Sequence, residues 1–397
     1  MVEKMTVRIA IILERADISL GGAQRSVFEL AGVLSAQDYK VEVLAAKGKG
    51  QTKNVRILCK DEPGRRTGLI RFAKALREYI AEHHYDIVHS TLPFDFVDLY
   101  QPRGGCFAES VLRNAASYEN VFIERYKRIT AFANLRRTIL LRAEKKLCKN
   151  PDGPVIAALS SYVAEQFKRH YGLGSERVKI IPNGVKINKR VDSSQSNRLR
   201  EQILMRLSIK EADEPILFLF VANNFRLKGL SSLIRAANTA MLGKSAKSAY
   251  LIVAGRDGSG KYRHLAAKLG IEKRVVFLGN LRHIQNALSI ADVAVLPTFY
   301  DPASRFILEA LAAATPVITT RYNGAIDLFV NDRHGRVIER PEDITALADA
   351  IAYFSNRQNI EQTSQAIIED NLKEKVSIAR AAKEIKLLYQ SIIKERK

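Results

Sequence analysis

The sequence of 397 residues is poor in cysteine and has no long apolar run. Its three cysteines, Cys59, Cys106 and Cys148, are odd in number and show no metal-ligand spacing. This pattern favours a reducing compartment, and we expect a cytoplasmic protein. No stretch reaches the roughly 18 uncharged residues that a membrane-spanning helix needs. The first residues, MVEKMTVRIAIILERA, lack the long apolar core of a signal peptide.

Acidic residues are scarce relative to basic ones. Lys and Arg total 63 against 42 Asp and Glu, which gives a net charge of +21. Such an excess indicates a polyanionic partner: nucleic acid, anionic lipid or a phosphorylated substrate. A nucleic-acid-binding protein would explain the charge, but the basic residues are not interleaved with stacking aromatics and no recognised nucleic-acid module is present. We therefore expect no nucleic-acid partner.

Apolar runs typical of strands alternate with amphipathic helical patterns. Three clear runs are 7–14, 40–46 and 215–222. The alternation restarts after a polar stretch at 188–202, which predicts an α/β fold with two Rossmann-like, parallel-sheet domains. We predict an N-terminal domain over 1–187, a C-terminal domain over 188–377, and a final helix over 378–397 that packs back on the first domain. Ligands of such sheets bind at the carboxyl ends of the strands.

Two loops that follow strands have features of anion sites. Gly21 and Gly22 come after the first strand and let backbone amides approach a ligand at a helix N-terminus. A tight turn is the alternative. Arg226 and Lys228 flank a second strand-to-helix turn, before Gly229. Two cations at a helix N-terminus oppose its dipole unless an anion neutralises them. Isolated surface charges are the alternative here.

A third loop carries two acids, Asp301 and Glu309, eight positions apart. Along an ideal helix this spacing is roughly 12 Å, which is similar to the reach of a sugar diphosphate to its ribose. Asp301 precedes Pro302 and has an alternative role as a helix N-cap. Glu309 lies in an apolar run, so we expect it to be exposed, paired or hydrogen-bonded to a ligand.

The stretch GRDGSGKY at 255–262 fits the phosphate-loop pattern up to its last position. That pattern needs Ser or Thr after its Lys to hold magnesium, whereas this chain has the bulky Tyr262. We therefore do not expect an ATPase.

Taken together, the motifs resemble the retaining glycosyltransferases of family 4, which have the two-domain GT-B fold. The segments that carry the resemblance are GGAQRS, IIPNGV (180–185), NNFRLKG, IVAG, VVFLGN, ADVAVLPT, YDPASRFILEALAAATPVITT and NGAIDLF (323–329). They follow the family's order over most of the chain. The sequence is most similar to the lipopolysaccharide core α-1,3-glucosyltransferases. The resemblance implies two Rossmann-like domains that face each other across a cleft.

The resemblance also implies roles for the site residues. Asp301 stands where the family usually has Glu and would face the donor sugar, while Glu309 would face the ribose. Arg226 is assigned as the substitute for the family's usual arginine, whose place is held by Asn223 or Asn224. The predicted donor site comprises Gly21, Gly22, Arg226, Lys228, Asp301, Glu309 and the backbone amides of Ala303, Ser304 and Arg305.

The implied reaction moves a hexose from a nucleoside diphosphate sugar, with UDP-glucose favoured, to a hydroxyl group with retention at the anomeric carbon. Charge that builds on the leaving diphosphate is the main barrier, and the predicted catalytic residues are Lys228, Arg226 and Asp301. The leaving phosphate accepts the acceptor's proton, so no protein nucleophile is required. Because no Asp-x-Asp motif is present, we expect neither a metal nor a cofactor. A GT-B epimerase of nucleotide sugars is the alternative.

Three residues of the first domain are predicted acceptor contacts: His89, Asp98 and Arg103. His89 follows an apolar strand, and a packed histidine is the favoured interpretation over a catalytic one. The family's His-x-His pattern is incomplete because Thr91 occupies the second place. Asp98 matches an acidic position of the glucosyltransferases.

The segment 103–149 holds eleven basic and four acidic residues, a charge of +7. Its apolar positions step by three or four, as one face of a helix would: Val111, Ala115, Tyr118, Phe122, Tyr126, Ile129 and Phe132. A helical lid with solvated charges is one interpretation. The other is an interfacial helix that docks on the anionic inner face of the cytoplasmic membrane. That would place the enzyme beside a lipid-linked or glycan acceptor such as lipopolysaccharide core.

Overall fold

The computed structural model describes residues 7–18, 21–37, 39–48, 54–59, 68–187, 190–243 and 246–396, apart from the side chains of residues 131 and 132. The chain divides into two compact units. The first comprises 1–115, 121–185 and 378–397, and the second comprises 116–120 and 186–377. The main division after Val185 comes two residues before the predicted domain boundary, and the C-terminal helix belongs to the first unit.

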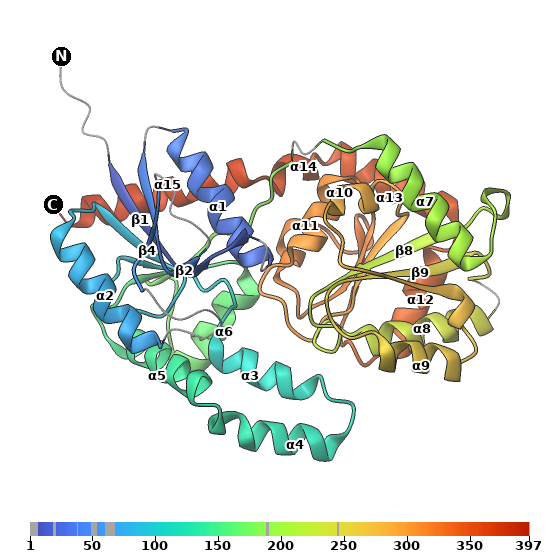
Figure 1. The fold of residues 1–397 in the computed structure, drawn as a ribbon, viewed down its shortest axis with the longest axis horizontal. Helices are drawn as coiled ribbons and strands as arrows, with labels where there is room; N and C mark the ends of the chain where they lie inside the picture. Colours follow the sequence, from blue (N-terminus) through green and yellow to red (C-terminus); the bar gives the residue numbers. More distant parts are fainter. Residues whose placement is uncertain are drawn as a thin grey trace. The chain divides into compact units, whose positions relative to one another are not determined.

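The first unit is built on a seven-stranded parallel sheet with the order β3-β2-β1-β4-β5-β6-β7 (Figure 1). Its strands are β1 (Arg8–Ala16), β2 (Lys40–Gly48), β3 (Val55–Ile57), β4 (Ile87–Ser90), β5 (Leu99–Tyr100), β6 (Val155–Ala158) and β7 (Val178–Ile180). Its helices are α1 (Gly22–Ser35), α2 (Leu69–Glu82), α3 (Phe107–Ala116), α4 (Val121–Ile129), η2 (Thr130–Ala133), α5 (Leu135–Lys149), α6 (Ser161–Tyr171) and α15 (Ile378–Glu395).

Helices cover both faces of this sheet, because the central strand β1 is apolar on both sides. Ile9 and Ile11 of β1 belong to a core with α1 and α15. Ala10 and Ile12 point to the other face, in a core with α2 and one residue of α5. Helix α15 runs beside α1 (Figure 1), and its apolar side chains recur every three or four residues as a single helix face requires.

The apolar positions predicted to form one helix face within 103–149 do not lie on a single helix. The segment forms α3, α4, the short η2 and α5, with a break at residues 117–120. The break falls at Ser-Tyr-Glu-Asn, and Asn134 begins α5 by accepting a hydrogen bond from the Arg137 amide at 3.1 Å. Polar side chains of this kind favour caps over helix interiors. The side chain of Phe132, part of the predicted apolar face, lies outside the described residues.

The second unit has a six-stranded parallel sheet with the order β10-β9-β8-β11-β12-β13. Its strands are β8 (Ile216–Val221), β9 (Ala249–Ala254), β10 (Val275–Gly279), β11 (Val293–Leu296), β12 (Val317–Thr320) and β13 (Gly335–Ile338). Its helices are α7 (Ser193–Leu207), η3 (Glu211–Asp213), α8 (Leu230–Leu242), α9 (Gly260–Lys268), η4 (Glu272–Arg274), α10 (Ile284–Leu288), α11 (Arg305–Ala312), η5 (Gly324–Leu328), α12 (Ile344–Tyr353), α13 (Arg357–Glu369) and α14 (Leu372–Lys375).

The predicted α/β architecture with two Rossmann-like parallel sheets is confirmed. Strands β8 and β11 are neighbours in the second sheet although β9 and β10 come between them in the chain. The strand order reverses at this point, and such switch points open a crevice at the carboxyl ends of the strands. The loops after β8 and β11 are the ones that carry Lys228 and Asp301.

Two properties of the whole chain can be checked in the structure. Within the described ranges, no helix combines the length and the apolar character needed to cross a membrane. Cys59, Cys106 and Cys148 are buried, and none of the three forms a disulfide bond.

Candidate functional site

The turn between β8 and α8 fixes Lys228 beside the start of a helix. Gly229 precedes α8 with a φ of 77°, in the left-handed region. A Cβ atom at this position would lie 2.0 Å from the carbonyl oxygen of Pro297, so no other residue fits without moving the loop after β11, which contains Pro297. The Leu227 amide donates to the Asn224 side chain at 3.0 Å, which closes the turn. The backbone around Lys228 is thus held from both sides.

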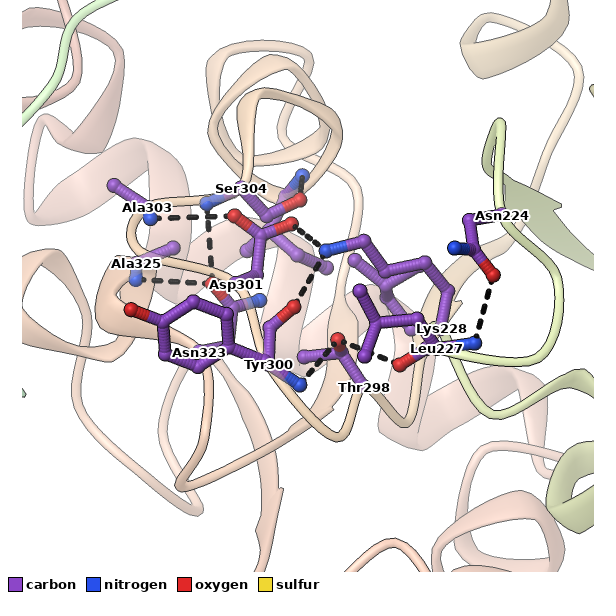
Figure 2. A network of polar contacts seen from close by, with 12 residues as sticks. Asn224, Leu227, Lys228, Thr298, Tyr300, Asp301, Ala303, Ser304, Asn323 and Ala325 are labelled. Carbon is purple, nitrogen blue, oxygen red and sulfur yellow. Dashed lines mark hydrogen bonds and ion pairs between the residues drawn. The ribbon is translucent and has the colours of Figure 1, made fainter. Parts of the chain in front are cut away.

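Lys228 forms an ion pair with Asp301, which lies 73 positions further along the chain (Figure 2). The Lys228 ammonium donates to Asp301 Oδ2 at 2.7 Å and to the carbonyl of Tyr300 at the same distance. Both side chains are largely buried, at 19% and 16% exposure. The structure therefore brings together two of the three predicted catalytic residues at the carboxyl edge of the second sheet.

Asp301 does not cap α11, so that alternative role is wrong. The N-cap is Ser304, whose hydroxyl accepts a hydrogen bond from the Ile307 amide. Asp301 instead accepts the amide of Ala303 at 3.2 Å on Oδ1, while its other oxygen holds Lys228. Each carboxylate oxygen therefore has a protein donor, and the structure gives Asp301 a role in positioning Lys228.

Asn323 joins this network but was not singled out as a site residue from the sequence (Figure 2). Its buried side-chain oxygen accepts the amides of Ser304 and Ala325, each at 3.1 Å, and its amide group donates to Thr319. The amides of Ala303 and Ser304, predicted to face a phosphate, are both engaged within the protein. The quoted NGAIDLF segment contained the signal, because Asn at the start of a helical turn after a strand is typical of a cap.

Glu309 lies in the middle of α11, at 8% exposure. Arg305, one turn earlier on the same helix, donates to its carboxylate at 3.1 Å, and the arginine side chain is 9% exposed. A buried carboxylate requires such a partner, because desolvation of an unpaired charge is costly. Of the three possibilities stated for Glu309, the structure shows it paired.

Arg226 is held by the segment 116–120, which belongs to the second unit. Its guanidinium lies over the Tyr118 ring at 3.8 Å from the centroid and donates to the Ser117 hydroxyl. Burial lowers its pKa, and nearby Tyr118, Tyr262 and Asp257 oppose that shift. Arg226 thus has contacts of its own, separate from the ion pair of Lys228 and Asp301.

Tyr262 stands where the phosphate-loop pattern requires Ser or Thr. Its ring is 1% exposed and packs edge-on against Phe225 at 5.6 Å, in the core of the second unit. The side chain that replaces the required hydroxyl therefore has a packing role.

In the first unit, α1 begins at Gly22 and Gly21 is its N-cap. The two residues before them, Ser19 and Leu20, lie outside the described residues. The Arg25 amide donates to the Gly21 carbonyl, which closes the first helical turn. The paired glycines therefore lie at a helix N-terminus, after β1, as predicted.

His89 is packed inside the first unit. It lies in β4 at 1% exposure, and its Nδ1 is 2.6 Å from the hydroxyl of Tyr389 on α15. Burial lowers the pKa of the imidazole to about 3, with a further contribution from Arg103. The ring is therefore neutral at physiological pH, and its contacts are those of a packed histidine that ties α15 to the sheet.

The other two predicted acceptor contacts also bond within the unit. Asp98 precedes β5, at the amino end of the strand, where its carboxylate accepts the Val88 amide at 2.7 Å and a guanidinium hydrogen of Arg396. We therefore correct the prediction for Asp98, because its position and its partners make it structural. Arg103 follows β5 at the carboxyl edge and donates to Asn183 at 2.9 Å, which leaves it on the side of the sheet where ligands bind.

Within the described ranges, no group of three or more His, Cys, Asp or Glu side chains is arranged to hold a metal ion. The described side chains offer fixed cations near hydrogen-bonding groups. Lys228 and Arg226 lie in the loop after β8, Asp301 lies in the loop after β11, and Glu309 lies in α11. Such an arrangement can stabilise a negative charge that develops on a bound group.

Two family models match the chain in tandem. Residues 20–189 match the model described as Glycosyltransferase Family 4, and residues 203–374 match Glycosyl transferases group 1. The chain carries the two domains of a family 4 glycosyltransferase. Lys228, Asp301 and Glu309 all fall in the second of these domains.

Curated relatives agree with this assignment. The lipopolysaccharide glucosyltransferase WaaG of Escherichia coli (strain K12) is 26% identical over 81% of this chain and 82% of its own length. An uncharacterized glycosyltransferase of Methanocaldococcus jannaschii, MJ1607, is 29% identical over 59% of each chain.

Several solved structures have the same fold. The crystal structure of WaaG superposes with a TM-score of 0.66 at 22% identity, over 95% of this chain and 94% of that one. Sucrose-phosphate synthase from Thermosynechococcus elongatus gives 0.72 at 19% identity, over 98% and 100%. Anabaena Alr3699/HepE in complex with UDP-glucose gives 0.67 at 16% identity, over 97% and 99%. The GT-B fold predicted for this glycosyltransferase is confirmed.

Proposed function

We propose that this glycosyltransferase moves glucose from UDP-glucose to a hydroxyl of a membrane-associated glycan or glycolipid, such as lipopolysaccharide core, with retention at the anomeric carbon. The observation that carries the proposal is the buried pair of Lys228 and Asp301 at the carboxyl edge of the second sheet. Further support comes from the similarity to WaaG, a lipopolysaccharide glucosyltransferase, and to the Anabaena protein that binds UDP-glucose.

In the proposed reaction, the bond between the anomeric carbon and the leaving phosphate oxygen breaks, and the electron pair goes to the diphosphate. The acceptor oxygen forms the new bond to that carbon, and its proton passes to the leaving phosphate. Lys228 and Arg226 stabilise the charge on the diphosphate, a contribution that is often the largest in catalysis. Asp301 holds Lys228 in place, and Glu309 binds the ribose. No metal or other cofactor is part of the proposal.

The membrane part of the proposal rests on α4. None of its residues is buried, and Figure 1 shows it at the margin of the first unit, away from the sheet. Phe122, Tyr126 and Ile129 lie on one helix face at 81%, 61% and 76% exposure. Basic residues accompany this face, and the combination is typical of helices that lie in a membrane interface. We propose that the enzyme works at the inner face of the cytoplasmic membrane, where its acceptor is held.

Incubation with radiolabelled UDP-glucose and a lipopolysaccharide core acceptor, in the presence of EDTA, tests the reaction. We expect label in the acceptor and an α-linkage in the product by NMR. A nucleotide-sugar epimerase would instead change the donor's sugar without any acceptor. Label transferred from GDP-mannose or a UDP-N-acetylhexosamine, but not from UDP-glucose, would reject the donor assignment.

Two variants connect the assay to the site. Glu309→Gln should lose most transfer because the carboxylate is proposed to bind the ribose. Glu339→Gln is a matched control, since it removes an exposed carboxylate of the same unit that pairs with Arg321. Near-normal turnover by Glu309→Gln would show that the donor site has been placed wrongly.

A further inference from the structure

The first unit contains a cavity of about 290 Å³, and none of the described residues that line it is assigned a role at the proposed donor site. It lies at the carboxyl ends of β1 and β2, where the first turns of α2 and α5 come together. The described residues that line it are Glu14, Ala46, Gly68, Leu69, Phe72, Leu92, Asn134, Leu135, Arg136, Ile139 and Leu140.

The inner wall of the cavity is apolar. Ala46, Phe72, Leu92 and Leu140 are buried members of the core on that face of the sheet. The cavity is thus a partly open gap at one end of a hydrophobic core, and apolar cavities can take up apolar molecules. A sugar or a phosphate would find few hydrogen-bonding partners among these side chains and would be costly to desolvate there.

The mouth of the cavity is different in character. Arg136 and Glu14 form an ion pair there, with side-chain exposures of 35% and 28%, so the two charges neutralise each other. Leu135, which also lines the cavity, is 74% exposed. An apolar interior with a narrow polar rim and an apolar exit suits an elongated hydrocarbon chain whose polar end stays outside.

The exit lies close to α4 in the chain. Only residues 130–134 separate Ile129, on the exposed apolar face of α4, from Leu135. The six steps from residue 129 to residue 135, at the rise of a 3₁₀ helix, cover about 12 Å. A hydrocarbon chain that leaves the cavity therefore emerges near the surface that we propose to contact the membrane.

We propose that this cavity binds one hydrocarbon chain of a membrane lipid or of the glycolipid acceptor. An apolar cavity of about 150 Å³ holds benzene, so 290 Å³ holds roughly ten carbon atoms. The bound hydrocarbon chain anchors the enzyme at one defined position on the bilayer. Electrostatic attraction between basic residues and anionic lipid alone would not fix that position. This inference rests on the proposed membrane attachment, but its test does not require transfer activity.

Alkyl maltosides with six to twelve carbons are suitable probes, because their head group is uncharged and constant. Calorimetry below the micelle concentration should show saturable binding at one site, and maltose alone should not bind. Affinity should rise about fourfold with each methylene, which corresponds to about 0.8 kcal/mol, and should level off near ten carbons. The absence of saturable binding, or an affinity that does not depend on chain length, would overturn the proposal.

Two variants fill the cavity from opposite walls. Ala46→Leu adds methylenes from β2, and Ile139→Trp adds a ring from α5; each should weaken binding at least tenfold. Ile70→Trp is the matched control, since Ile70 is 75% exposed on α2 and does not line the cavity. Thermal unfolding identifies a variant that fails to fold, and the binding affinity of the other variant then tests the proposal. Wild-type affinity in the folded variants would overturn the proposal.

Two further measurements show where the probe binds and which kind of lipid supplies the hydrocarbon chain. If Phe122→Ser abolishes probe binding while the filled variants bind normally, the probe occupies the α4 surface and the cavity proposal is wrong. To separate the lipid source, a short-chain phosphatidylglycerol and a decyl glycoside should compete for the same site if the chain alone is recognised. Probe binding by a protein without transfer activity would support the cavity and reject the proposed reaction.

Discussion

Lys228 and Asp301 are the residues whose geometry says most about catalysis. The carboxylate holds the ammonium at 2.7 Å, and the Tyr300 carbonyl holds it at the same distance. A cation fixed in this way loses less conformational freedom when an anion binds than a mobile surface lysine would. The pair is therefore expected to contribute to turnover through position as well as charge.

We predict that Lys228→Ala lowers kcat about 100-fold, the usual effect of removing one group that stabilises developing charge.

Asp301→Asn should lower kcat more than it weakens UDP binding, because the amide no longer neutralises and orients Lys228. Asp301→Glu should recover part of the loss. Steady-state kinetics and UDP titration measure both quantities, with Glu339→Gln as the control. If Asp301→Asn melts several degrees lower but turns over normally, the pair is only structural.

At this scale the sequence predicted positions better than contacts. Strand and helix patterns place Lys228 and Asp301 in loops at the carboxyl ends of strands and Glu309 in the helix that follows Asp301, and the structure has them there. The partners were not predictable, because Lys228 and Asp301 are 73 positions apart and meet only when β8 and β11 pair. The same reason led to the wrong role for Asp98, whose partner Arg396 is 298 positions away. Asn323 differs, because its partners in this network are 2, 4 and 19 positions away and its capping position could be recognised in the sequence.

Helix α4 differs from its neighbours α3 and α5 because none of its residues is buried. Other parts of the basic segment 103–149 form ion pairs, which are Arg113–Glu109, Arg136–Glu14 and Lys146–Asp95. Glu109 also pairs with Arg169 of α6, which anchors α3. The side chains of α4 have no comparable burial. A periodicity of three to four residues predicted the apolar face, but it could not reveal the break at 117–120, which turns α4 into a separate helix.

Vesicle co-sedimentation tests the role of α4. We predict binding to vesicles that contain phosphatidylglycerol, with a sharp decrease at high salt, since each nearby Lys or Arg contributes about 1 kcal/mol and salt screens it. Phe122→Ser combined with Ile129→Ser should weaken binding at least tenfold. Leu242→Ser is the control, because it removes a side chain of the second unit that is 75% exposed. Equal binding to neutral vesicles would contradict the electrostatic part.

For the chain as a whole, alternation of apolar strands and amphipathic helices was enough to predict two parallel-sheet domains. The return of the final helix, α15, to the first unit was also predicted, and the structure shows a contact that holds it there: the Tyr389 hydroxyl bonds His89 within the buried core. The sequence could not show which titratable side chains are buried inside this unit. Two buried titratable groups, His89 and Glu144, have pKa values shifted in opposite directions.

These two groups link the stability of the whole unit to pH. Burial lowers the pKa of His89 to about 3, so the unfolded chain binds more protons below pH 6.5 and the contribution of His89 to stability increases with pH up to that value. Glu144 behaves in the opposite way. Burial raises its pKa to about 7, although hydrogen bonds from the Phe107 amide, Tyr171, Tyr100 and Cys106 oppose the shift. Its carboxyl group therefore stabilises the fold below pH 4.5, and that contribution is lost as the pH rises towards 7.

We predict that Glu144→Gln costs stability at pH 4.5 to 5 and becomes neutral or stabilising by pH 8. A shift from 4.5 to about 7 corresponds to a change of about 3 kcal/mol across this range, at 1.36 kcal/mol per pKa unit. The amide keeps an acceptor for the surrounding hydroxyl groups but cannot ionise. Unfolding midpoints of wild type and variant between pH 4.5 and 8 measure the difference, in which the contribution of His89 cancels. Glu78→Gln is the control, since Glu78 is 63% exposed on α2. A difference that stays constant with pH would show that Glu144 has the same protonation in the folded and unfolded chain.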